Sequence, residues 1–263
     1  MKKPRIKLSH ITSSLLIAVM AATAQVTSAQ QNDPLQWDVK IGPRLESYST
    51  PWVGGDHQNE WFPYMSASYG NWKIGGNSQS LLSYQAIKNQ TWGLSMGLGY
   101  RDDGYDSGFS DDPVFSGYDA PDADITAFVG LSYDSLFIQA SQDVSSNSES
   151  SALSITLKHP LYRSQAGFML NVSAAAHWYD KDYVNYNYGV NEDQVNAAVG
   201  RTVYQGDAAL NLDLGLSAIY RINKQWMLIG SVNLIELDDE ITDSPLIDDD
   251  HADITRVILG YRF

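Results

Sequence analysis

The chain ends in the segment Asp253-Ile-Thr-Arg-Val-Ile-Leu-Gly-Tyr-Arg-Phe263, in which apolar and polar residues alternate up to a terminal phenylalanine. Successive side chains of a β-strand point to opposite faces of the sheet. One face of this strand carries Val257, Leu259, Tyr261 and Phe263. The other face carries Arg256, Gly260 and Arg262. The first face suits lipid and the second suits water, so the segment predicts the closing strand of a transmembrane β-barrel.

The opposite end of the chain has the features of a secretory signal peptide. Basic residues lie between positions 2 and 7, an apolar segment runs from Ile11 to about Ala22, and small residues allow cleavage after Ala24 or Ala29. This apolar segment is shorter than the ~20 residues that a membrane-spanning helix needs. We therefore expect residues 1–29 to be a cleaved leader and residues 30–263 to form a single outer-membrane β-barrel domain.

Composition excludes several classes of protein. The chain has no cysteine, which excludes disulfides, thiolate metal sites and thiol nucleophiles. All 31 acidic residues lie beyond the leader, which holds four of the 17 basic ones. Because a nucleic-acid backbone requires a basic surface, this strongly acidic chain is not expected to bind nucleic acid.

Period-two stretches along the chain predict an all-β, antiparallel transmembrane barrel of about twelve strands, with 10 or 14 as alternatives. The predicted strands are residues 36–48, 60–69, 71–77, 79–87, 91–101, 123–134, 135–144, 151–159, 165–178, 204–221, 224–237 and 253–263. The clearest alternation lies between Ala208 and Tyr220, where leucine occupies every second position from Leu210 to Leu216. In lipid an unpaired sheet edge leaves backbone groups unsatisfied, so the first and last strands should pair and close the barrel.

Connections between these strands alternate between short and long. The short ones are residues 70–71, 88–90, 134–135, 159–164 and 222–224, and the long ones include 102–122, 179–203 and 238–252. Outer-membrane barrels have short periplasmic turns and long extracellular loops. The pattern therefore predicts a location in the outer membrane with the N-terminus in the periplasm.

Aromatic residues near the predicted strand ends match the interfacial girdles of membrane barrels. They are Trp37, Tyr48, Trp61, Trp72, Trp92, Tyr100, Tyr133, Trp178, Tyr220, Trp226, Tyr261 and Phe263. The alternative is a soluble, lipocalin-like barrel, but the strand lengths, the terminal phenylalanine and the loop asymmetry favour the membrane. Expected partners are outer-membrane lipid and lipopolysaccharide, together with the barrel-assembly machinery, which would recognise the C-terminal strand.

Charged residues on the polar strand faces are predicted to face the lumen. The candidates are Asp38, Lys40, Arg44, Glu46, Arg101, Asp213, Arg256 and Arg262. Pairing of the first and last strands should bring Arg256 and Arg262 towards Asp38 and Glu46. Barrels of 8 strands are filled by side chains and those of 16–18 leave a channel. A twelve-stranded lumen can therefore be either a plug of paired charges or a narrow solute path.

Two long connections are rich in aspartate, residues 102–122 and 238–250. Clustered carboxylates can bind Ca²⁺ or Mg²⁺ through oxygen ligands. Neither run has the spacing of an EF-hand loop, so we expect a solvated, negatively charged rim, without a metal site or cofactor. The alternative is weak binding of divalent cations near lipopolysaccharide.

No catalytic constellation emerges from the sequence. Ser173 and His177 lie on one strand face but about 13 Å apart along the strand, at ~3.3 Å per residue. A nucleophile and its base must be in hydrogen-bond contact. We therefore expect a protein that is not an enzyme, with His177 as a polar group of the lumen.

Several short tracts resemble the MipA/OmpV family of outer-membrane proteins, which is named after the MltA-interacting protein. They are Pro51-Trp-Val-Gly-Gly-Asp56, Phe62-Pro-Tyr64, Gly130-Leu-Ser-Tyr133, Ile138-Gln-Ala-Ser-Gln-Asp-Val144, Tyr186-Asn-Tyr-Gly-Val-Asn191, Asp243-Ser-Pro-Leu246 and Gly260-Tyr-Arg-Phe263. The resemblance implies an outer-membrane protein without known catalytic residues. It also implies a scaffold that joins a murein transglycosylase to a penicillin-binding protein, while other members are linked to adhesion, osmotic response or antibiotic susceptibility. The Asp-rich insert at 102–122 and the Ser-rich connection at 145–151 depart from the family pattern.

Three functions stay open at this point: a murein-enzyme scaffold, a small-solute channel, and a surface adhesion or envelope-stress protein that uses its acidic loops. The scaffold needs a periplasmic surface, and the short turns offer little area against the ~800 Å² per partner of a standard interface. It therefore depends on the family resemblance, whereas the channel depends on the lumen residues.

Overall fold

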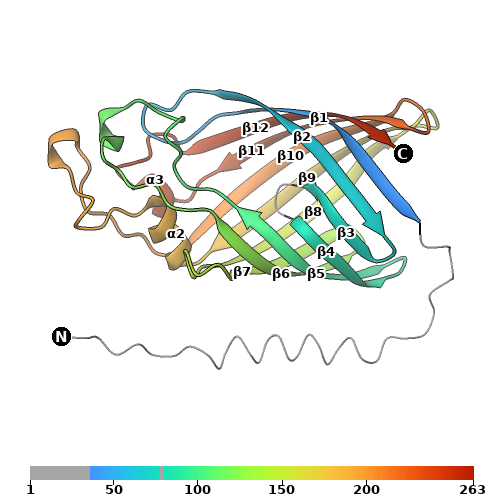
Figure 1. Ribbon diagram of the computed structural model, residues 1–263, viewed down its shortest axis with the longest axis horizontal. Helices are drawn as coiled ribbons and strands as arrows, with labels where there is room; N and C mark the ends of the chain where they lie inside the picture. The colour runs from blue at the N-terminus through green and yellow to red at the C-terminus, as the bar shows by residue number, and fades with distance from the viewer. Residues whose placement is uncertain (1–35, 78–79) are drawn as a thin grey trace. The chain divides into compact units, whose positions relative to one another are not determined.

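Twelve antiparallel strands close into a barrel in the computed structural model, which describes residues 36–77 and 80–263 (Figure 1). The strands are β1 (Trp37–Tyr48), β2 (Gln58–Tyr69), β3 (Trp72–Asn77), β4 (Ser80–Lys88), β5 (Trp92–Arg101), β6 (Asp124–Tyr133), β7 (Leu136–Asp143), β8 (Ser151–Arg163), β9 (Phe168–Tyr179), β10 (Ala209–Arg221), β11 (Trp226–Glu236) and β12 (His251–Arg262). Each strand pairs with its neighbours in sequence, and β1 pairs with β12. The predicted fold class, strand number and closure are confirmed.

The seam between β1 and β12 has the predicted antiparallel register. Glu46 lies opposite Arg256, and Lys40 lies opposite Arg262. The ladder extends to the last residue, because the backbone N–H of Phe263 donates to the carbonyl of Val39 at 3.0 Å. The closing strand is thus paired along its length and leaves no edge in the membrane.

The outer wall presents aliphatic side chains and, at one end, a belt of aromatic rings. Leu214 on β10 is 63% exposed, as expected for a lipid-facing position. Aromatic pairs across neighbouring strands lie at the end of the barrel with the short turns: Trp37–Tyr69, Trp72–Tyr84, Trp92–Tyr133, Tyr162–Phe168 and Trp226–Tyr261. These pairs form an interfacial girdle. No helix among the described residues is long and apolar enough to cross a membrane.

Tyr48 does not belong to the girdle, contrary to the prediction. It shares the inner face of β1 with Glu46, and its hydroxyl donates to Oε1 of Glu60 on β2 at 3.0 Å. Position near a strand end suggested an interfacial role, but the parity of β1 places this ring inside.

Two predicted boundaries are wrong for identifiable reasons. The turn expected at 159–164 is a continuation of β8, which accommodates Pro160 at an irregularity between Pro160 and Tyr162. A bulge lets a proline stay in a strand despite its missing N–H. The strand expected from residue 204 begins at Ala209, because Tyr204 pairs instead with Val190 in the preceding loop.

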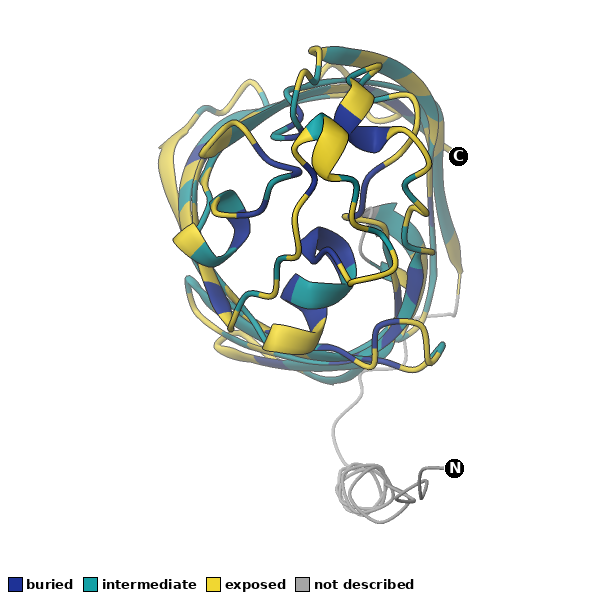
Figure 2. Ribbon diagram, turned by 90° about the vertical axis from the view of Figure 1, so that its left-hand side faces the viewer, coloured by how far each residue is buried: buried dark blue, intermediate teal, exposed yellow. Residues whose placement is uncertain are grey.

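The long connections fold together at the opposite end of the barrel, which we call the outer end. They comprise residues 49–57, 102–123, 144–150, 180–208 and 237–250, and we call them the loop cap. The cap includes the short helices α2 (Lys181–Tyr188) and α3 (Asp239–Thr242). Figure 2 shows these segments lying across the outer end, with their buried parts in dark blue. The sequence pattern predicts long loops there but no helices.

Capping residues explain the position of both helices. The side chain of Asp180 accepts from the N–H of Tyr183 at the start of α2, and Asp238 accepts from Glu240 at the start of α3. An aspartate at this position satisfies an N–H that has no partner within the helix. Asp238 therefore has a structural use inside a run that the sequence suggested was a solvated rim.

The main buried apolar cluster lies in the loop cap rather than in the barrel wall. Its members are Trp52, Tyr105, Val114, Phe115, Tyr183, Val184, Tyr188, Val190, Ala209, Ile241, Leu246 and Ile247. Trp52 stacks on Tyr188 with ring centroids 5.3 Å apart. The predicted leader, residues 1–29 with cleavage after Ala24 or Ala29, lies outside the described residues and stays a prediction.

Candidate functional site

Small residues line much of the inner wall. Residues directly opposite each other in a ladder share a face of the sheet. Arg101 and Asp124 point inward, so every second residue of β5 before Arg101 shares the inner face. These residues are Gly99, Gly97, Ser95 and Gly93, and the opposite positions on β6 are Thr126, Phe128, Gly130 and Ser132. The ring of Phe128 packs over Gly97, while the other short side chains leave space inside a twelve-stranded barrel.

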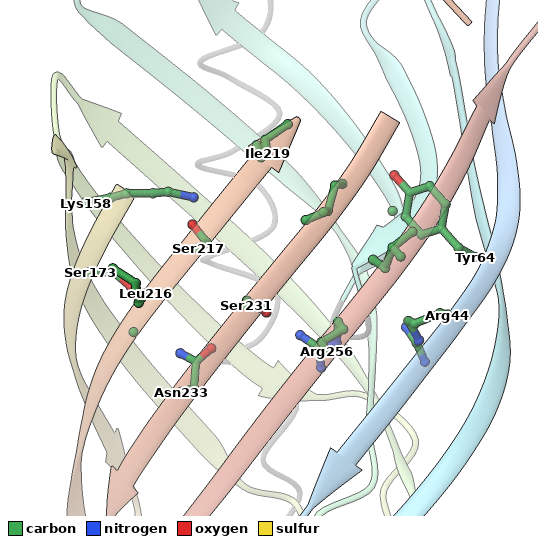
Figure 3. Close-up of a pocket in the computed structure, with 14 residues that line it drawn as sticks. Arg44, Tyr64, Lys158, Ser173, Leu216, Ser217, Ile219, Ser231, Asn233 and Arg256 are labelled. Carbon is green, nitrogen blue, oxygen red and sulfur yellow. The ribbon is translucent and has the colours of Figure 1, made fainter. Parts of the chain in front are cut away.

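A cavity of about 300 Å³ occupies part of the lumen. Its charged lining residues are Arg44 from β1, Lys158 from β8 and Arg256 from β12. Ser173, Ser217, Ser231 and Asn233 add polar groups, while Tyr64, Ile219, Ile229 and Ile258 add an apolar surface. Figure 3 shows Lys158 on one side of the cavity and Arg44 and Arg256 on the other.

Two of these cations share one carboxylate. Oε1 of Glu46 lies 3.4 Å from Nε of Arg44 and also accepts from Nε of Arg256. Glu46 is only 9% exposed. The guanidinium of Arg44 also lies over the ring of Phe62, 4.7 Å from its centroid, which is a favourable cation–π arrangement.

The third cation, Lys158, has no acidic partner within salt-bridge distance in the described part of the chain. The nearby acid Asp213 is engaged by the amide of Asn233, whose Nδ2 donates to both carboxylate oxygens at 2.8 and 3.0 Å. Among the residues that the structure describes, none of those lining the cavity is acidic. The cavity therefore carries an excess of positive charge.

A second charged group lies at the turn end of the lumen. Asp38 accepts from Nζ of Lys40 at 2.9 Å and from Nε of Arg262 at 2.8 Å. The Arg262 contact crosses the seam between β1 and β12. These partly exposed pairs help to fix the register of the closing strands, although exposed ion pairs contribute little stability, typically ~0–1 kcal/mol.

A third group joins the lumen to the loop cap. Arg101 pairs with Asp124 at 2.7 Å, and its guanidinium carbon lies 5.0 Å from the ring centroid of Tyr183 in α2. The hydroxyl of Tyr183 donates to Asp103 at 2.9 Å. Asp103 is an exposed residue, but its carboxylate packs against Tyr183, and the local loss of hydration raises its pKa, although Tyr183 and Arg101 act in the opposite direction.

The eight predicted lumen residues thus fall into four places. Asp38, Lys40 and Arg262 lie at the turn end; Arg44, Glu46 and Arg256 lie at the cavity; Arg101 lies beneath the cap; and Asp213 lies beside Asn233. The apolar side of the cavity, formed by Tyr64, Ile219, Ile229 and Ile258, was not predicted from the sequence. Their spacing was the available signal. Ile258 lies two residues from Arg256, and Ile219 lies two residues from Ser217, so each isoleucine shares the inner face with a polar residue.

One serine–histidine contact is present in the lumen. Oγ of Ser154 lies 2.8 Å from Nδ1 of His177, a pairing across β8 and β9. A catalytic triad requires a third group that orients the histidine. Within residues 36–77 and 80–263, no hydrogen bond or ion pair joins a third side chain to His177, so the contact is an incomplete triad.

Arg201 holds two cap segments together. Its guanidinium donates to the carbonyls of Gln194, Val114 and Ser116, and the residue is 3% exposed. It also lies 5.6 Å from the ring centroid of Tyr118, whose pKa burial raises to about 12. The residues at 114–118 and 194–201 are far apart in sequence, so this arginine helps to close the cap.

Acidic residues of the cap divide into structural and exposed groups. Asp248 accepts from the N–H of Gly54 at 3.0 Å and so joins two loops. Asp111 and Asp119 remain exposed. Asp249, Asp250 and His251 bring their ligand atoms within 4.8 Å of one another at exposed positions. The outer surface of the cap is thus negatively charged, whereas the cavity beneath it is positively charged.

Comparison with known proteins gives a consistent assignment. The family described as MltA-interacting protein MipA matches residues 27–263. An outer membrane protein named YiaT from Escherichia coli (strain K12) is 24% identical over 233 residues, covering 86% of this chain and 91% of the relative. The MltA-interacting protein of the same strain is 28% identical over 104 residues, covering 39% and 42% of the two chains.

Among solved structures, the NanC porin has 13% sequence identity and a TM-score of 0.39, covering 87% of this chain and 100% of that one. Among the relatives in sequence, the outer membrane protein OmpV of Vibrio cholerae is 26% identical over 90 residues, which is 34% of each chain. The family match covers most of the sequence and the relatives are outer-membrane proteins. The chain therefore belongs to the MltA-interacting protein MipA family and is an outer-membrane β-barrel.

Proposed function

We propose that the barrel provides a narrow path through the outer membrane for small solutes that carry negative charge. The observation that supports this most strongly is the excess of positive charge in the lumen cavity. Lys158 has no acidic partner in the described structure, and Arg44 and Arg256 share a single carboxylate from Glu46. A carboxylate or phosphate in the cavity would complete the pairing of these cations.

The polar lining supports passage rather than permanent binding. Ser173, Ser217 and Ser231 present hydroxyl groups that can donate to a solute or to water. Conduction requires binding that is favourable enough for entry and weak enough for release. One unpaired lysine with several weak neutral donors meets this requirement better than a fully enclosing set of arginines.

The loop cap restricts this path. Its segments lie across the outer end of the barrel (Figure 2), and their aromatic cluster is well buried. A solute that enters from outside must either wait for the cap to move or use a route that avoids it.

Planar-bilayer recordings with the refolded barrel would test the proposal. We expect discrete conductance steps and a reversal potential, under a salt gradient, that shows preference for chloride over potassium. Lys158→Gln should lower that preference about threefold, because it removes the unpaired cation of the cavity. Lys224→Gln is the matched control, since Lys224 is exposed in a turn outside the cavity. Absence of discrete steps at several voltages, or cation preference in the unmodified barrel, would overturn the proposal.

A second proposal, that the barrel is a scaffold for a murein transglycosylase and a penicillin-binding protein, is supported by the name of the MltA-interacting relative and of the family. The turns at 70–71, 89–91, 134–135, 164–167 and 222–225 offer a small surface. Co-purification from detergent-solubilised envelopes would test it, with an unrelated barrel as control. Recovery of murein enzymes no higher than in that control would count against the scaffold.

We also propose that the barrel-assembly machinery reads the C-terminal strand, and that the aliphatic outer wall contacts lipid and lipopolysaccharide. Phe263 is 71% exposed, so its ring is available for recognition at the end of β12. Deletion of Phe263 should lower the amount of folded barrel in the outer membrane, whereas Phe263→Tyr should not. Equal amounts from the deletion variant and the unmodified chain would exclude this role.

A further inference from the structure

The barrel wall is lower at β3 and β4 than elsewhere, and we call this part the low wall. β2 contains 12 residues and β3 only six, and the two strands pair only between Ser66–Tyr69 and Trp72–Gly75. On the other side of the β3–β4 hairpin, the ladder between β4 and β5 ends at Leu98. Within the described residues, the outer half of β2 therefore pairs with β1 alone. Figure 1 shows the short β3 and β4 beside the long β2.

Local sequence explains why β3 leaves the ladder. Gly75 and Gly76 have φ values of +64° and +94°, which side chains on L-residues rarely allow. A Cβ on Gly75 would lie 2.5 Å from the carbonyl oxygen of Met65. The two glycines thus let β3 approach β2 closely and then turn away from it.

Residues 58–65 of β2, the free part that does not pair with β3 in the described structure, have the composition of a sheet edge that needs no further partner strand. Pro63 has no N–H to leave unpaired, and proline in sheets is largely confined to edge strands. Trp61 and Met65 are 71% and 64% exposed on the outer face. The cap reaches β2 at its first residue, where the side chain of Gln58 donates to the carbonyl of Gly108 at 3.5 Å. Non-helical backbone at membrane depth is tolerated where it lines a cavity.

The low wall adjoins the lumen cavity. Tyr64, on the inner face of the free part of β2, lines the cavity, and so does Gly76 at the end of the β2–β3 contact. Arg44 lies next to them and stacks on Phe62 of the same edge. Figure 3 shows Tyr64 and Arg44 on the same side of the cavity. The neighbouring Ile258 and Ile229 make this part of the cavity apolar.

We infer that the low wall between β2 and β5 is a lateral opening through which amphipathic anions exchange between the outer leaflet and the lumen cavity. The ligand class is a single carboxylate, phosphate or sulfonate group attached to an apolar body. Arg44, Arg256 and Lys158 would bind the anionic group, and Tyr64 and the isoleucines would contact the apolar part. The ligand class rests on the proposed anion path, whereas the opening itself rests on the strand register.

Charge on the two routes favours the lateral one. The exposed surface of the cap carries acids such as Asp111 and Asp119, which form no ion pair within the described residues and which repel an approaching anion. The edge of β2 carries Trp61, Pro63 and Met65 towards lipid and has one acid, Glu60, which accepts from Tyr48 at the inner face. An anion with an apolar tail already partitions into the leaflet, so it would reach the cavity without crossing the acidic cap.

Lipid quenching of single fluorescent labels tests the opening. The chain has no cysteine, so one introduced cysteine gives one labelled site. Labelled Tyr64→Cys in bilayers with bromine on the acyl chains should lose about half as much fluorescence as labelled Leu214→Cys on the lipid face. Ser173→Cys, on the cavity wall at β9, should lose little. Phe62→Cys provides a second position on the edge, and the gel mobility of the folded barrel confirms folding of each variant.

Quenching of the labels at 62 and 64 no greater than at 173 would overturn the lateral opening, whether or not the barrel conducts. A separate measurement tests the ligand class. Decanoate should block the chloride current at a concentration at least about tenfold lower than gluconate, which lacks an apolar tail. Equal potency would overturn the amphipathic ligand class. Absence of any current would overturn the proposed function and leave the quenching result to decide the opening.

Discussion

The loop cap and the lumen differ in both packing and charge. The cap has a buried aromatic and aliphatic cluster and an acidic outer surface. The lumen has small and polar inner residues, and its cavity is lined by three cations. The cap is therefore held by a hydrophobic core of its own, whereas the barrel is held by its ladders and the surrounding membrane. Disruption of one region should leave the other folded.

This difference also bears on function. An acidic surface in front of a basic cavity repels the ions that the cavity prefers. Such an arrangement is unfavourable for a simple axial anion pore. It is favourable for a barrel that receives anions by another route, or whose cap must open first. Substitutions in one region at a time should separate the contributions of cap and lumen.

The largest effect is expected from Arg201→Ala. The substitution leaves the carbonyls of Val114, Ser116 and Gln194 without their shared donor, and each buried unsatisfied group costs ~1–3 kcal/mol. We expect the cap to open, with faster hydrogen exchange and proteolysis at residues 102–123, while the barrel keeps its folded gel mobility. Arg221→Ala, an exposed arginine at the turn end, is the control. Simultaneous loss of the barrel would show that cap and wall are not independent.

The next largest effect is expected from Glu46→Gln. Arg44 and Arg256 would lose their shared negative charge, so chloride preference should increase about twofold. Replacing the charged acceptor should also lower the free energy of unfolding by ~1–3 kcal/mol. Bilayer recordings and thermal unfolding in detergent measure the two effects. Glu192→Gln, an exposed acid of the cap, should leave the free energy of unfolding unchanged and, at 1 M salt, the chloride preference as well.

A smaller effect is expected from pH through Asp103. Loss of hydration raises its pKa in the folded cap, so the folded cap binds a proton more tightly than the open loops do. Lowering the pH towards the raised pKa should therefore stabilise the closed cap, and raising the pH above it should remove that contribution. Hydrogen exchange at residues 102–123 would measure this. Asp103→Asn should abolish the dependence. Asp102→Asn should preserve it at a slightly lower pH, because the charge of Asp102 also helps to raise the pKa of Asp103.

The smallest effect is expected from neutralising exposed acids of the cap. The double variant Asp111→Asn/Asp119→Asn should raise the chloride conductance modestly at low salt and not at 1 M salt, where the Debye length is ~3 Å. A comparable increase at high salt would point to a change of cap structure instead. The measurement thus distinguishes long-range repulsion from opening of the loops.

Most of the barrel could be predicted from the sequence because its walls obey a strict period of two. Leu210 to Leu216 on β10 follow it without interruption, and the closing strand from Arg256 to Phe263 follows it except at Ile258, which faces the lumen cavity. Pro160 led to the wrong prediction of a turn at 159–164. The strand continues through it because a bulge accommodates a proline without ending the strand. Tyr48 lies near a strand end, as girdle residues do, but its parity on β1 turns it towards the lumen and Glu60.

The cap could not be predicted in the same way. Its order depends on contacts between distant segments, such as Arg201 with Val114 and Trp52 with Tyr188, and no local period reports them. At the cavity, the pairing of β1 with β12 was sufficient to join Glu46 to Arg256. The position of Lys158 across the lumen from Arg44 and Arg256 depends on the curvature of the closed barrel, which the sequence does not show. The low wall at β3 depends on the pairing register of four strands, which local patterns do not show either.

Anomalous scattering from crystals of the barrel soaked in sodium bromide would test the central claim most directly, because it locates an anion without any transport assay. The account predicts a bromide peak in the cavity between Lys158 and the Arg44–Arg256 pair, and its loss in Lys158→Gln. Bromide found only on the outer surface of the protein, with none in the cavity, would contradict the account.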